Sequence, residues 1–320
     1  MPEEERPLQQ QQRSRDIQIM HSNDETVETK LQRIAEKAGR DPECRFTSLF
    51  HLVDKELLLG CFNALKEGKA SGIDRITKEQ YAGNLMENLD DLIGRLHRMA
   101  YIPQPVLRVY IPKAGSKKMR PLGIPALEDK LVQAALSKIL QAIYEQDFID
   151  DSYGFRPNRS CHDALRIINQ TITGKGTNYI VEADIKGFFD NVDQDELMEF
   201  LAHRIADKRV LRYIKRFLKS GIHEEGVFRA SEKGTPQGGV ISPVLANLYL
   251  HYTLDLWFQR KYLKTCTGTA RLIRYADDFV VCFKQEADAK RFRIEMEKRL
   301  NQYGLEIAPE KTKILEFGPQ

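Results

Sequence analysis

The chain has 320 residues, which is enough for two subdomains with a substantial hydrophobic core. Its 49 Lys and Arg residues nearly balance 46 Asp and Glu residues, so the net charge of +3 does not indicate a globally basic nucleic-acid binder. No apolar run is long enough to span a bilayer, and five cysteines without a Cys-x-x-Cys pair argue against a zinc site and a disulfide framework.

The N-terminal part reads as a tail followed by helices. Residues 1–25 are rich in charge and glutamine and show no hydrophobic periodicity, which predicts a disordered tail. Apolar residues then recur at helical spacing in the segments 27–38, 49–65 and 78–99. The first segment ends at a Gly-Arg-Asp-Pro break, the second holds one or two helices, and the third predicts a single helix.

A basic hairpin follows these helices. The segments 106–112 and 119–124 predict two strands, and the Gly- and Lys-rich segment 113–118 predicts the turn between them. Across residues 107–130 the chain carries six basic residues against two acidic ones. The hairpin therefore either binds an anion or forms a solvated, lysine-rich edge that blocks aggregation.

The rest of the chain alternates long helices with a few short strands. Helical spacing predicts helices over 129–148, 162–172, 193–205, 210–218, 243–262 and 287–303. Apolar runs predict strands over 179–183, 227–230, 272–273, 279–283 and 313–317. Together these elements predict an α+β fold in which helices back a small number of strands.

Two adjacent carboxylates, Asp277 and Asp278, lie between two apolar runs that predict a β-hairpin with a tight turn. Adjacent like charges repel unless a cation neutralises them, and oxygen ligands suit Mg²⁺. Asp184, at the end of another predicted strand, supplies a third carboxylate for a two-metal phosphoryl-transfer site. The alternative is a polar hairpin turn together with a strand-end cap.

The segment 234–243 holds three glycines and two prolines directly before a predicted helix. Glycine lets a backbone approach a ligand closely, which would allow Gln237 to contact a nucleotide base or sugar. The same pattern is typical of a loop leading into a helix, with Ser242 as the N-cap and Pro243 at the first helical position. The two interpretations are compatible.

Seven motifs occur in one order along the chain. They are Ser71–Asp74, the hairpin from Ile111 to Pro125, Tyr153–Pro157 with Arg159–His162, Asp184 with Phe188–Asp190, Gly234–Gly239, Tyr275–Asp278, and Gly304–Leu305 with Pro309–Lys313. Over residues 45–317 the chain resembles the reverse transcriptase domain of bacterial group II intron-encoded proteins, the intron maturases. The resemblance implies a right-hand polymerase with fingers and palm that acts in intron splicing and retrohoming.

The resemblance also implies roles for individual residues. Asp184, Asp277 and Asp278, with the backbone carbonyl of Ile185, would bind two Mg²⁺ ions, for which Mn²⁺ can substitute. The residues implied to contact the incoming nucleotide are Lys113 and Arg120 at the triphosphate, Phe189 as the steric gate against a ribose 2′-hydroxyl, Gln237 in the pocket, and Lys311 at the leaving pyrophosphate. Phe188 is the better candidate for a buried core aromatic.

The same resemblance divides the chain into parts. Residues 1–25 would be a tail, 26–175 the N-terminal extension and fingers, and 176–320 the palm, with finger-derived segments near 206–235. The implied template contacts are Arg156, Arg159 and the loop from Ser71 to Asp74. The family continues into a thumb and a maturase domain beyond the point where this chain stops, so we expect weak or no processive synthesis from this segment alone.

The implied partners are intron RNA, an RNA template with a DNA primer, and dNTPs, in the bacterial cytoplasm and without a membrane. A homodimer is compatible with the resemblance. One alternative is a module that binds intron RNA and promotes splicing without polymerisation. Another is a related reverse transcriptase recruited to a different role, such as defence.

Overall fold

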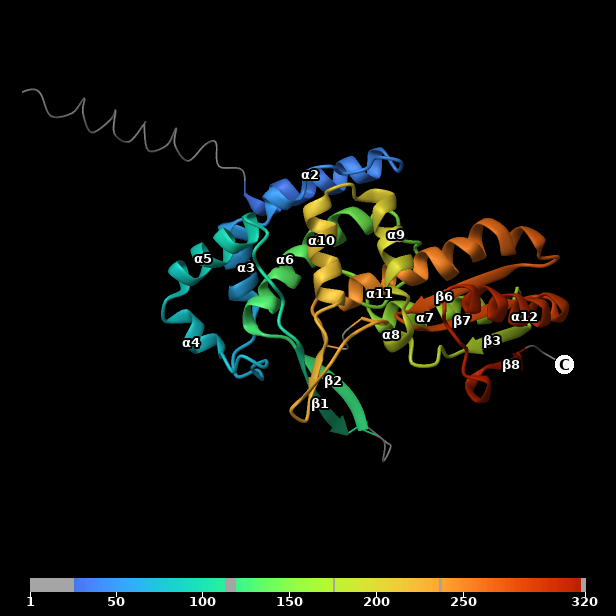
Figure 1. Cartoon of the computed structure of the whole chain (residues 1–320). Helices are drawn as coiled ribbons and strands as arrows, with labels where there is room; N and C mark the ends of the chain where they lie inside the picture. Colours follow the sequence, from blue (N-terminus) through green and yellow to red (C-terminus); the bar gives the residue numbers. More distant parts are fainter. Residues whose placement is uncertain (1–25, 113–118, 175, 236–237, 318–320) are drawn as a thin grey trace, which may run out of the picture.

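The computed structural model describes residues 26–112, 119–174, 176–235 and 238–317. The predicted tail, Lys113 and Gln237 lie outside these residues. Figure 1 shows the described chain as helices arranged around two separate sheets. None of the helices in this part of the chain is long and apolar enough to cross a bilayer.

The first sheet is antiparallel and carries the predicted carboxylates. In spatial order its strands are β6 (Ala270–Tyr275), β7 (Asp278–Phe283), β3 (Tyr179–Ala183) and β8 (Lys313–Glu316). Ala183 pairs with Phe279, and Tyr275 pairs with Asp278. Because β3 and β7 run in opposite directions, this register places the C-terminal end of β3 beside the turn between β6 and β7. The predicted hairpin and both further strands of this sheet are confirmed.

The second sheet is mixed and contains the basic hairpin. In spatial order its strands are β2 (Met119–Ile124), β1 (Val106–Pro112), β4 (Ile222–Glu224) and β5 (Val227–Arg229). The predicted hairpin is confirmed, with Ile111 opposite Arg120. The sequence does not predict β4, which pairs in parallel with β1 through Val106 and Ile222. A segment from late in the chain therefore widens the hairpin sheet at its base.

Helices form the N-terminal part, as the sequence predicts. They are α2 (Val27–Arg40), η1 (Phe50–Leu52), α3 (Lys55–Ala64), α4 (Lys78–Ala82), α5 (Leu85–His97) and α6 (Leu127–Tyr144). The prediction of one helix over 78–99 is wrong, because the chain breaks after Gly83, where Asn84 adopts φ −130° and ψ 40°. Gly and Asn are both poor helix formers, and a capping box between Thr77 and Gln80 defines the start of the first piece.

The second half of the chain contributes the remaining helices. They are α7 (Cys161–Thr173), α8 (Phe188–Asn191), α9 (Gln194–Arg204), α10 (Lys208–Leu218), α11 (Ser242–Leu250), η2 (His251–Asp255), η3 (Phe258–Tyr262), η4 (Leu263–Thr265), α12 (Glu286–Gln302) and η5 (Pro309–Lys311). The helix predicted over 243–262 begins at Ser242, so Ile241 and not Ser242 is its N-cap. Beyond α11 it continues as the π-helical segments η2 and η3, a geometry that is common near functional sites.

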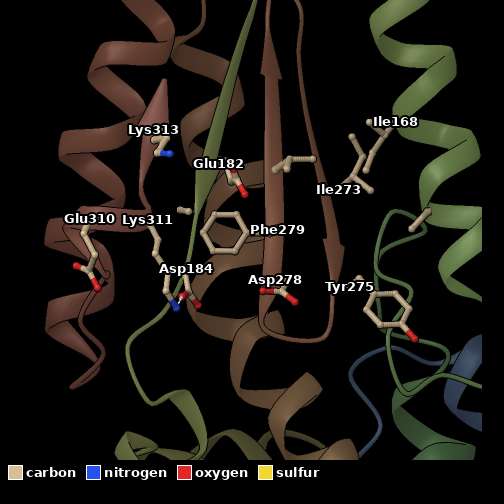
Figure 2. Close-up of a pocket in the computed structure, with 13 residues that line it drawn as sticks. Ile168, Glu182, Asp184, Ile273, Tyr275, Asp278, Phe279, Glu310, Lys311 and Lys313 are labelled. Carbon is tan, nitrogen blue, oxygen red and sulfur yellow. Dashed lines mark hydrogen bonds and ion pairs between the residues drawn. The ribbon is translucent and has the colours of Figure 1, made fainter. Parts of the chain in front are cut away.

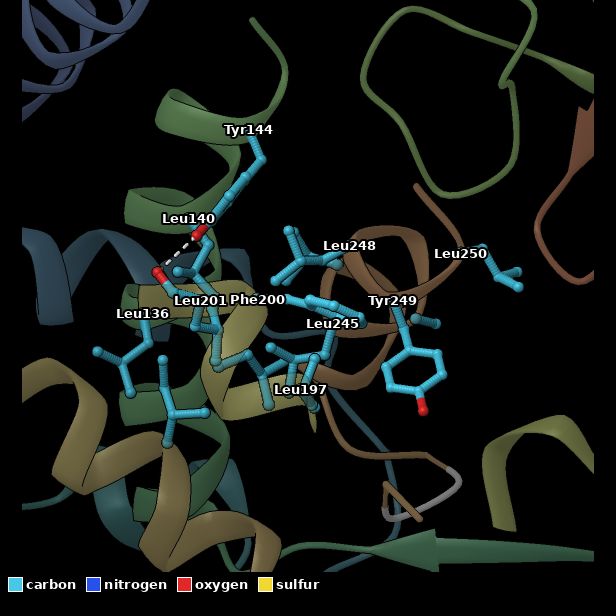
Figure 3. Packing of buried hydrophobic residues seen from close by; sticks show 14 of the residues in the cluster. Leu136, Leu140, Tyr144, Leu197, Phe200, Leu201, Leu245, Leu248, Tyr249 and Leu250 are labelled. Atoms are coloured by element: carbon cyan, nitrogen blue, oxygen red, sulfur yellow. Dashed lines mark hydrogen bonds between the residues drawn. The ribbon is translucent and has the colours of Figure 1, made fainter. Parts of the chain in front are cut away.

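One part of the main hydrophobic core lies between α6, α9 and α11 (Figure 3). Leu140 of α6, Leu201 of α9 and Leu245 of α11 are all fully or almost fully buried. Tyr144, at the end of α6, donates its hydroxyl to the carbonyl oxygen of Leu201 at 3.0 Å, which satisfies a polar group inside the core. The helix α12 packs against β3 and β7, so helices support the antiparallel sheet from behind.

Candidate active site

The turn between β6 and β7 presents Asp277 beside the end of β3. Its two loop residues are Ala276 and Asp277, and Ala276 has a φ of +56°. A positive φ at the first loop residue matches the twist of two-residue hairpins, although it is uncommon for a residue other than glycine. Asp278 begins β7 and Asp184 directly follows β3. Three carboxylates therefore lie at the same end of the antiparallel sheet.

Two of these carboxylates interact electrostatically. Asp277 is half-buried; burial raises the pKa of its carboxyl, and the negative charge of Asp184 raises this pKa further. Arg120 and Arg274 act in the opposite direction, because their positive charges favour the ionised form. A repelling pair of carboxylates in a partly desolvated place favours the binding of a cation.

Lys311 lies against the same group of carboxylates. Figure 2 shows Asp184 and Lys311 near the end of β3, and Asp278 at the neighbouring end of β7. The ammonium group of Lys311 forms a hydrogen-bonded ion pair with Oδ2 of Asp184, and this pairing raises the pKa of Lys311. All three side chains line a hollow of about 520 Å³, a size typical of small-molecule sites.

The donor set suits a hard divalent cation. Mg²⁺ and Ca²⁺ prefer oxygen ligands, and carboxylates are the commonest of them in proteins. The backbone carbonyl of Ile185, which directly follows Asp184, is a further oxygen ligand. Among the residues that the structure describes, no three carboxylate, imidazole or thiol side chains already form a metal-binding cluster. Lys311 is paired with Oδ2 of Asp184, so a metal that took this oxygen would displace the ammonium group of Lys311 from it.

A second hollow, of about 360 Å³, lies between the basic hairpin and the glycine-rich loop. Its walls include Arg120 of β2, Phe189 of α8, and Gly238 with Gly239 of the loop. Phe188 is only 2% exposed, whereas Phe189 is half-buried and faces the hollow. The expectation that Phe188 is the core aromatic is confirmed, whereas the role of Phe189 as a gate against a sugar hydroxyl stays a prediction.

Two glycines are required because backbones approach closely. Gly238 has a φ of +98°, and a Cβ atom at this position would lie 2.2 Å from the carbonyl oxygen of Gly123 in β2. Gly154 lies directly under the carboxylate turn, where a Cβ atom would lie 2.2 Å from the backbone nitrogen of Ala276. Real Cβ atoms do not come so close, so both contacts depend on the missing side chain.

The structure contradicts one predicted template contact and leaves the others as predictions. Arg156 is buried, and it donates to the carbonyl oxygens of Ile149 and Ser152 at 2.7 and 2.8 Å. The prediction that Arg156 lies along a template is therefore wrong, because its guanidinium braces a loop inside the protein. Arg159 is half-buried and pairs with exposed Asp150 at 3.2 Å.

The loop from Ser71 to Asp74 has a structural role that the sequence does not predict. A carboxylate oxygen of Asp74 accepts the backbone N–H of Leu127 at 3.2 Å, at the start of α6. Gly72 lies so close to Ala126 that a Cβ atom there would be 2.5 Å from its backbone nitrogen. The loop therefore closes the N-terminal end of α6, and its contact with a template stays a prediction.

The sequence reasoning missed a charged group buried directly behind the turn. Arg274 and Asp255 are fully buried, and their side chains form two parallel hydrogen bonds of 2.9 and 2.6 Å. Arg274 also donates to Asn247 at 2.9 Å and to the carbonyl oxygen of Ala276 at 2.9 Å. An arginine in an apolar strand and an aspartate in an apolar helix are the signal that could have found this pair, because such residues are rarely buried alone.

Comparison with known proteins shows the family of this chain. A family model described as "Reverse transcriptase (RNA-dependent DNA polymerase)" matches residues 111–317. This range contains all three carboxylates, strand β2 of the basic hairpin and the glycine-rich loop. The chain therefore belongs to the reverse transcriptase family.

Two individual relatives show how similar the chain is to known proteins, and over which length. The group II intron-encoded protein LtrA of Lactococcus lactis subsp. cremoris is 41% identical over 222 residues, which are 69% of this chain and 37% of that protein. Protein YkfC of Escherichia coli (strain K12) is 34% identical over 321 residues, which are 89% of this chain and 84% of that protein. The chain thus spans little more than a third of the intron-encoded relative.

A solved structure shares the fold. Telomerase from Candida albicans, in complex with a fragment of telomeric RNA, aligns with a TM-score of 0.54 at 14% sequence identity. The alignment covers 76% of this chain and 47% of the telomerase chain. At this level of identity the likeness supports the mixed helix and strand fold alone.

Proposed function

We propose that the protein is an RNA-directed DNA polymerase that acts with a group II intron in splicing and retrohoming. The observation that carries the proposal is the position of Asp184, Asp277 and Asp278 at one end of the antiparallel sheet, beside the hollow that holds Lys311. We assign residues 176–320 to the palm. The mixed sheet, including β4 and β5 near 206–235, belongs with the N-terminal helices to the fingers.

The proposed substrates are a DNA primer on an RNA template and a dNTP, with intron RNA as a further partner. Asp184, Asp277, Asp278 and the carbonyl of Ile185 would hold two Mg²⁺ ions, or Mn²⁺ in their place. When bound, such ions lower the pKa of the primer 3′-hydroxyl and neutralise the departing pyrophosphate.

The chain's own residues have separate tasks in this proposal. Lys311 releases Asp184, and its ammonium group then meets the pyrophosphate. Arg120 approaches the triphosphate from the hairpin, since its guanidinium binds phosphate as a rigid fork. Phe189 occupies the space that a ribose 2′-hydroxyl would need, so a deoxyribose is preferred. For Lys113 and Gln237 the proposed roles in nucleotide binding rest on the sequence.

Single-nucleotide addition tests this function without requiring processive synthesis. The protein, in excess, is mixed with a DNA primer annealed to an RNA template, one dNTP and Mg²⁺. We expect addition of the complementary nucleotide only, with dNTP preferred over NTP, and complete loss when EDTA removes the metal. Absence of any metal-dependent addition would contradict the proposal, and specific binding of intron RNA by the same inactive sample would favour the splicing module instead.

A further inference from the structure

The turn that carries Asp277 is held from inside the protein by one guanidinium. Arg274 precedes the turn in β6 and is among the largest fully buried side chains in the described chain. Its Nη1 atom donates to the carbonyl oxygen of Ala276, the residue that directly precedes Asp277, at 2.9 Å. A single arginine therefore bridges the strand before the turn and the loop residue next to the carboxylate.

Asp255 fixes the other side of the same guanidinium. Its two oxygens accept from Nε and Nη2 of Arg274 at 2.9 and 2.6 Å, so that the planar fork is gripped on one edge. His251 lies 3.9 Å from Asp255, and burial lowers the pKa of this histidine to about 4. The imidazole is consequently neutral near pH 7, and Arg274 is the cation that balances Asp255.

Asn247 connects the guanidinium of Arg274 to Gly154, which lies under the turn. Its side-chain oxygen accepts from Nη1 of Arg274 at 2.9 Å, and its side-chain nitrogen donates to the carbonyl oxygen of Gly154 at 2.7 Å. Gly154 in turn lies directly against the backbone of Ala276. The loop residue is thus held on two sides, by Arg274 through a hydrogen bond and by Gly154 through contact.

Stability alone is a poor explanation for this group. Burying an ion pair costs desolvation energy that its attraction often fails to recover, and apolar residues of similar volume frequently stabilise a protein as well or better. What a bidentate guanidinium supplies is geometry, because its donors point in fixed directions. Residues that do not touch a metal but orient its ligands commonly do so through hydrogen bonds of fixed direction.

We propose that Arg274, Asp255 and Asn247 form a buried positioning group that holds the Ala276 carbonyl, and through it the Asp277 carboxylate, in the geometry required for metal binding. This inference rests on the proposed function, since it assigns the group to the same carboxylate site. None of the three side chains contacts the substrate in this scheme. They act through the turn, which a shift of about 1 Å would place outside catalytic geometry.

The same strand offers a matched control. Arg271 also forms a bidentate pair, with Asp151, through two hydrogen bonds of 2.7 Å. Its side chain is 42% exposed, and its side-chain partners are Asp151 and Thr171. Asp151 also accepts the backbone N–H of Arg274 through its own backbone carbonyl, a bond that the substitution at Arg271 leaves in place. Replacing each arginine with lysine keeps the charge and removes the fork. Both variants therefore lose a bidentate guanidinium, but only the guanidinium of Arg274 is hydrogen-bonded to the turn.

The test compares Arg274→Lys and Arg271→Lys with the wild-type protein by three measurements. These are Mn²⁺ affinity by electron paramagnetic resonance, the maximal rate and half-saturating dNTP concentration of single-nucleotide addition, and thermal unfolding. For Arg274→Lys we expect Mn²⁺ affinity and maximal rate to fall on the order of 10- to 100-fold. The half-saturating dNTP concentration should stay within about twofold, since no contact with the nucleotide is lost. Arg271→Lys should change each quantity by less than about twofold.

A double variant, Arg274→Met with Asp255→Leu, separates positioning from folding. It leaves no orphaned charge, so the thermal midpoint should be retained or raised while Mn²⁺ affinity and rate stay low. A folded double variant with wild-type Mn²⁺ affinity and wild-type rate would overturn the inference. If the wild-type protein itself neither binds Mn²⁺ nor adds a nucleotide, the proposed function fails and the inference fails with it. If the wild-type protein and the Arg274 variants are equally active, the inference alone fails.

Discussion

The turn of the antiparallel sheet and the hairpin of the mixed sheet are held in opposite ways. Behind the turn, Arg274 and Val281 are fully buried, and every side chain of the buried group is hydrogen-bonded. On the hairpin, Tyr110 is 47% exposed and Met119 is 52% exposed. A packed core with satisfied polar groups holds one geometry, whereas a strand pair open to solvent moves more easily.

This difference separates two tasks of one site. In the proposed function the carboxylates need fixed positions, because metal ligands tolerate little displacement. In the same proposal the hairpin approaches and leaves a charged substrate, for which an exposed cation such as Arg120 is suited. Changes at the turn should therefore reduce the maximal rate and the affinity for metal. Changes on the hairpin should instead raise the nucleotide concentration needed for half saturation.

Among single substitutions that leave the carboxylates in place, the largest effect is expected for Gly154→Ala. The added Cβ atom would lie 2.2 Å from the Ala276 nitrogen, so the turn has to move. A displacement of about 1 Å near reacting groups can cost on the order of 100-fold in rate, and single-turnover addition measures it. Gly60→Ala is the control, because no atom lies within 4 Å of a Cβ at that position. A Gly154→Ala protein as fast as Gly60→Ala would show that the turn tolerates displacement.

A smaller effect of a different kind is expected for Arg120→Ala. This change removes a fork that can bind phosphate, so the half-saturating dNTP concentration should rise about tenfold while the maximal rate changes less. Steady-state titration with dNTP measures both quantities. Arg108→Ala, in the facing strand and outside the lining of the hollow, should leave them unchanged. An Arg120 variant with reduced rate and unchanged half-saturation would mean that the hairpin does not act as a substrate arm.

Phe189→Val should change selectivity more than rate. The smaller side chain leaves room for a 2′-hydroxyl, so NTP incorporation relative to dNTP should rise about tenfold. Competition between the two sugars on one template measures this ratio. Unchanged sugar discrimination would place the gate at another residue.

The least effect on activity is expected for Asp129→Asn, at the base of the hairpin. Asp129 accepts from Tyr101 and from the backbone of Gln104 at 2.5 and 3.0 Å, and burial raises its pKa from 3.8 to about 7. A raised pKa means that the folded state binds the proton more tightly than the unfolded state does. The stability from this proton is fully present below pH 3.8 and is lost as the pH rises through about 7.

Replacing Asp129 with the uncharged amide should remove this pH dependence. The unfolding free energy of the wild type should fall relative to Asp129→Asn between about pH 4 and 8, by on the order of 4 kcal/mol. Urea unfolding at several pH values measures the difference. Parallel pH profiles of the two proteins would refute the assignment, whereas nucleotide addition should differ little between them at any pH where both are folded.

Local pattern accounts for the parts of the site that the sequence predicts. The hairpin around Asp277 and the strand before Asp184 follow from short apolar runs and a tight turn, which are properties of neighbouring residues. The pairing of β4 with β1 has no such signal, because it joins segments far apart in the chain. The break at Gly83 and Asn84 was hidden by an apolar stripe that continues through both helices.

The burial of individual arginines could not be predicted from the sequence. Arg156 and Arg274 both look like candidates for solvent or nucleic acid in a list of basic residues, yet both are buried. Their partners, which include carbonyl oxygens and Asp255, become visible only when distant segments are placed together. Burial of a guanidinium depends on tertiary contacts, and the residues on either side of it in the chain do not reveal them.

The central claim is that the carboxylates of the turn hold the metal for RNA-templated DNA synthesis. Single-nucleotide addition by Asp277→Asn with Asp278→Asn tests it most directly, because these changes remove two negative charges and keep the side-chain shape. We predict that the double variant folds with an unchanged circular dichroism spectrum and loses at least about 1000-fold in rate, or ~4 kcal/mol of transition-state stabilisation. A folded double variant that still adds nucleotides in a metal-dependent manner at a rate near that of the wild type would contradict the account.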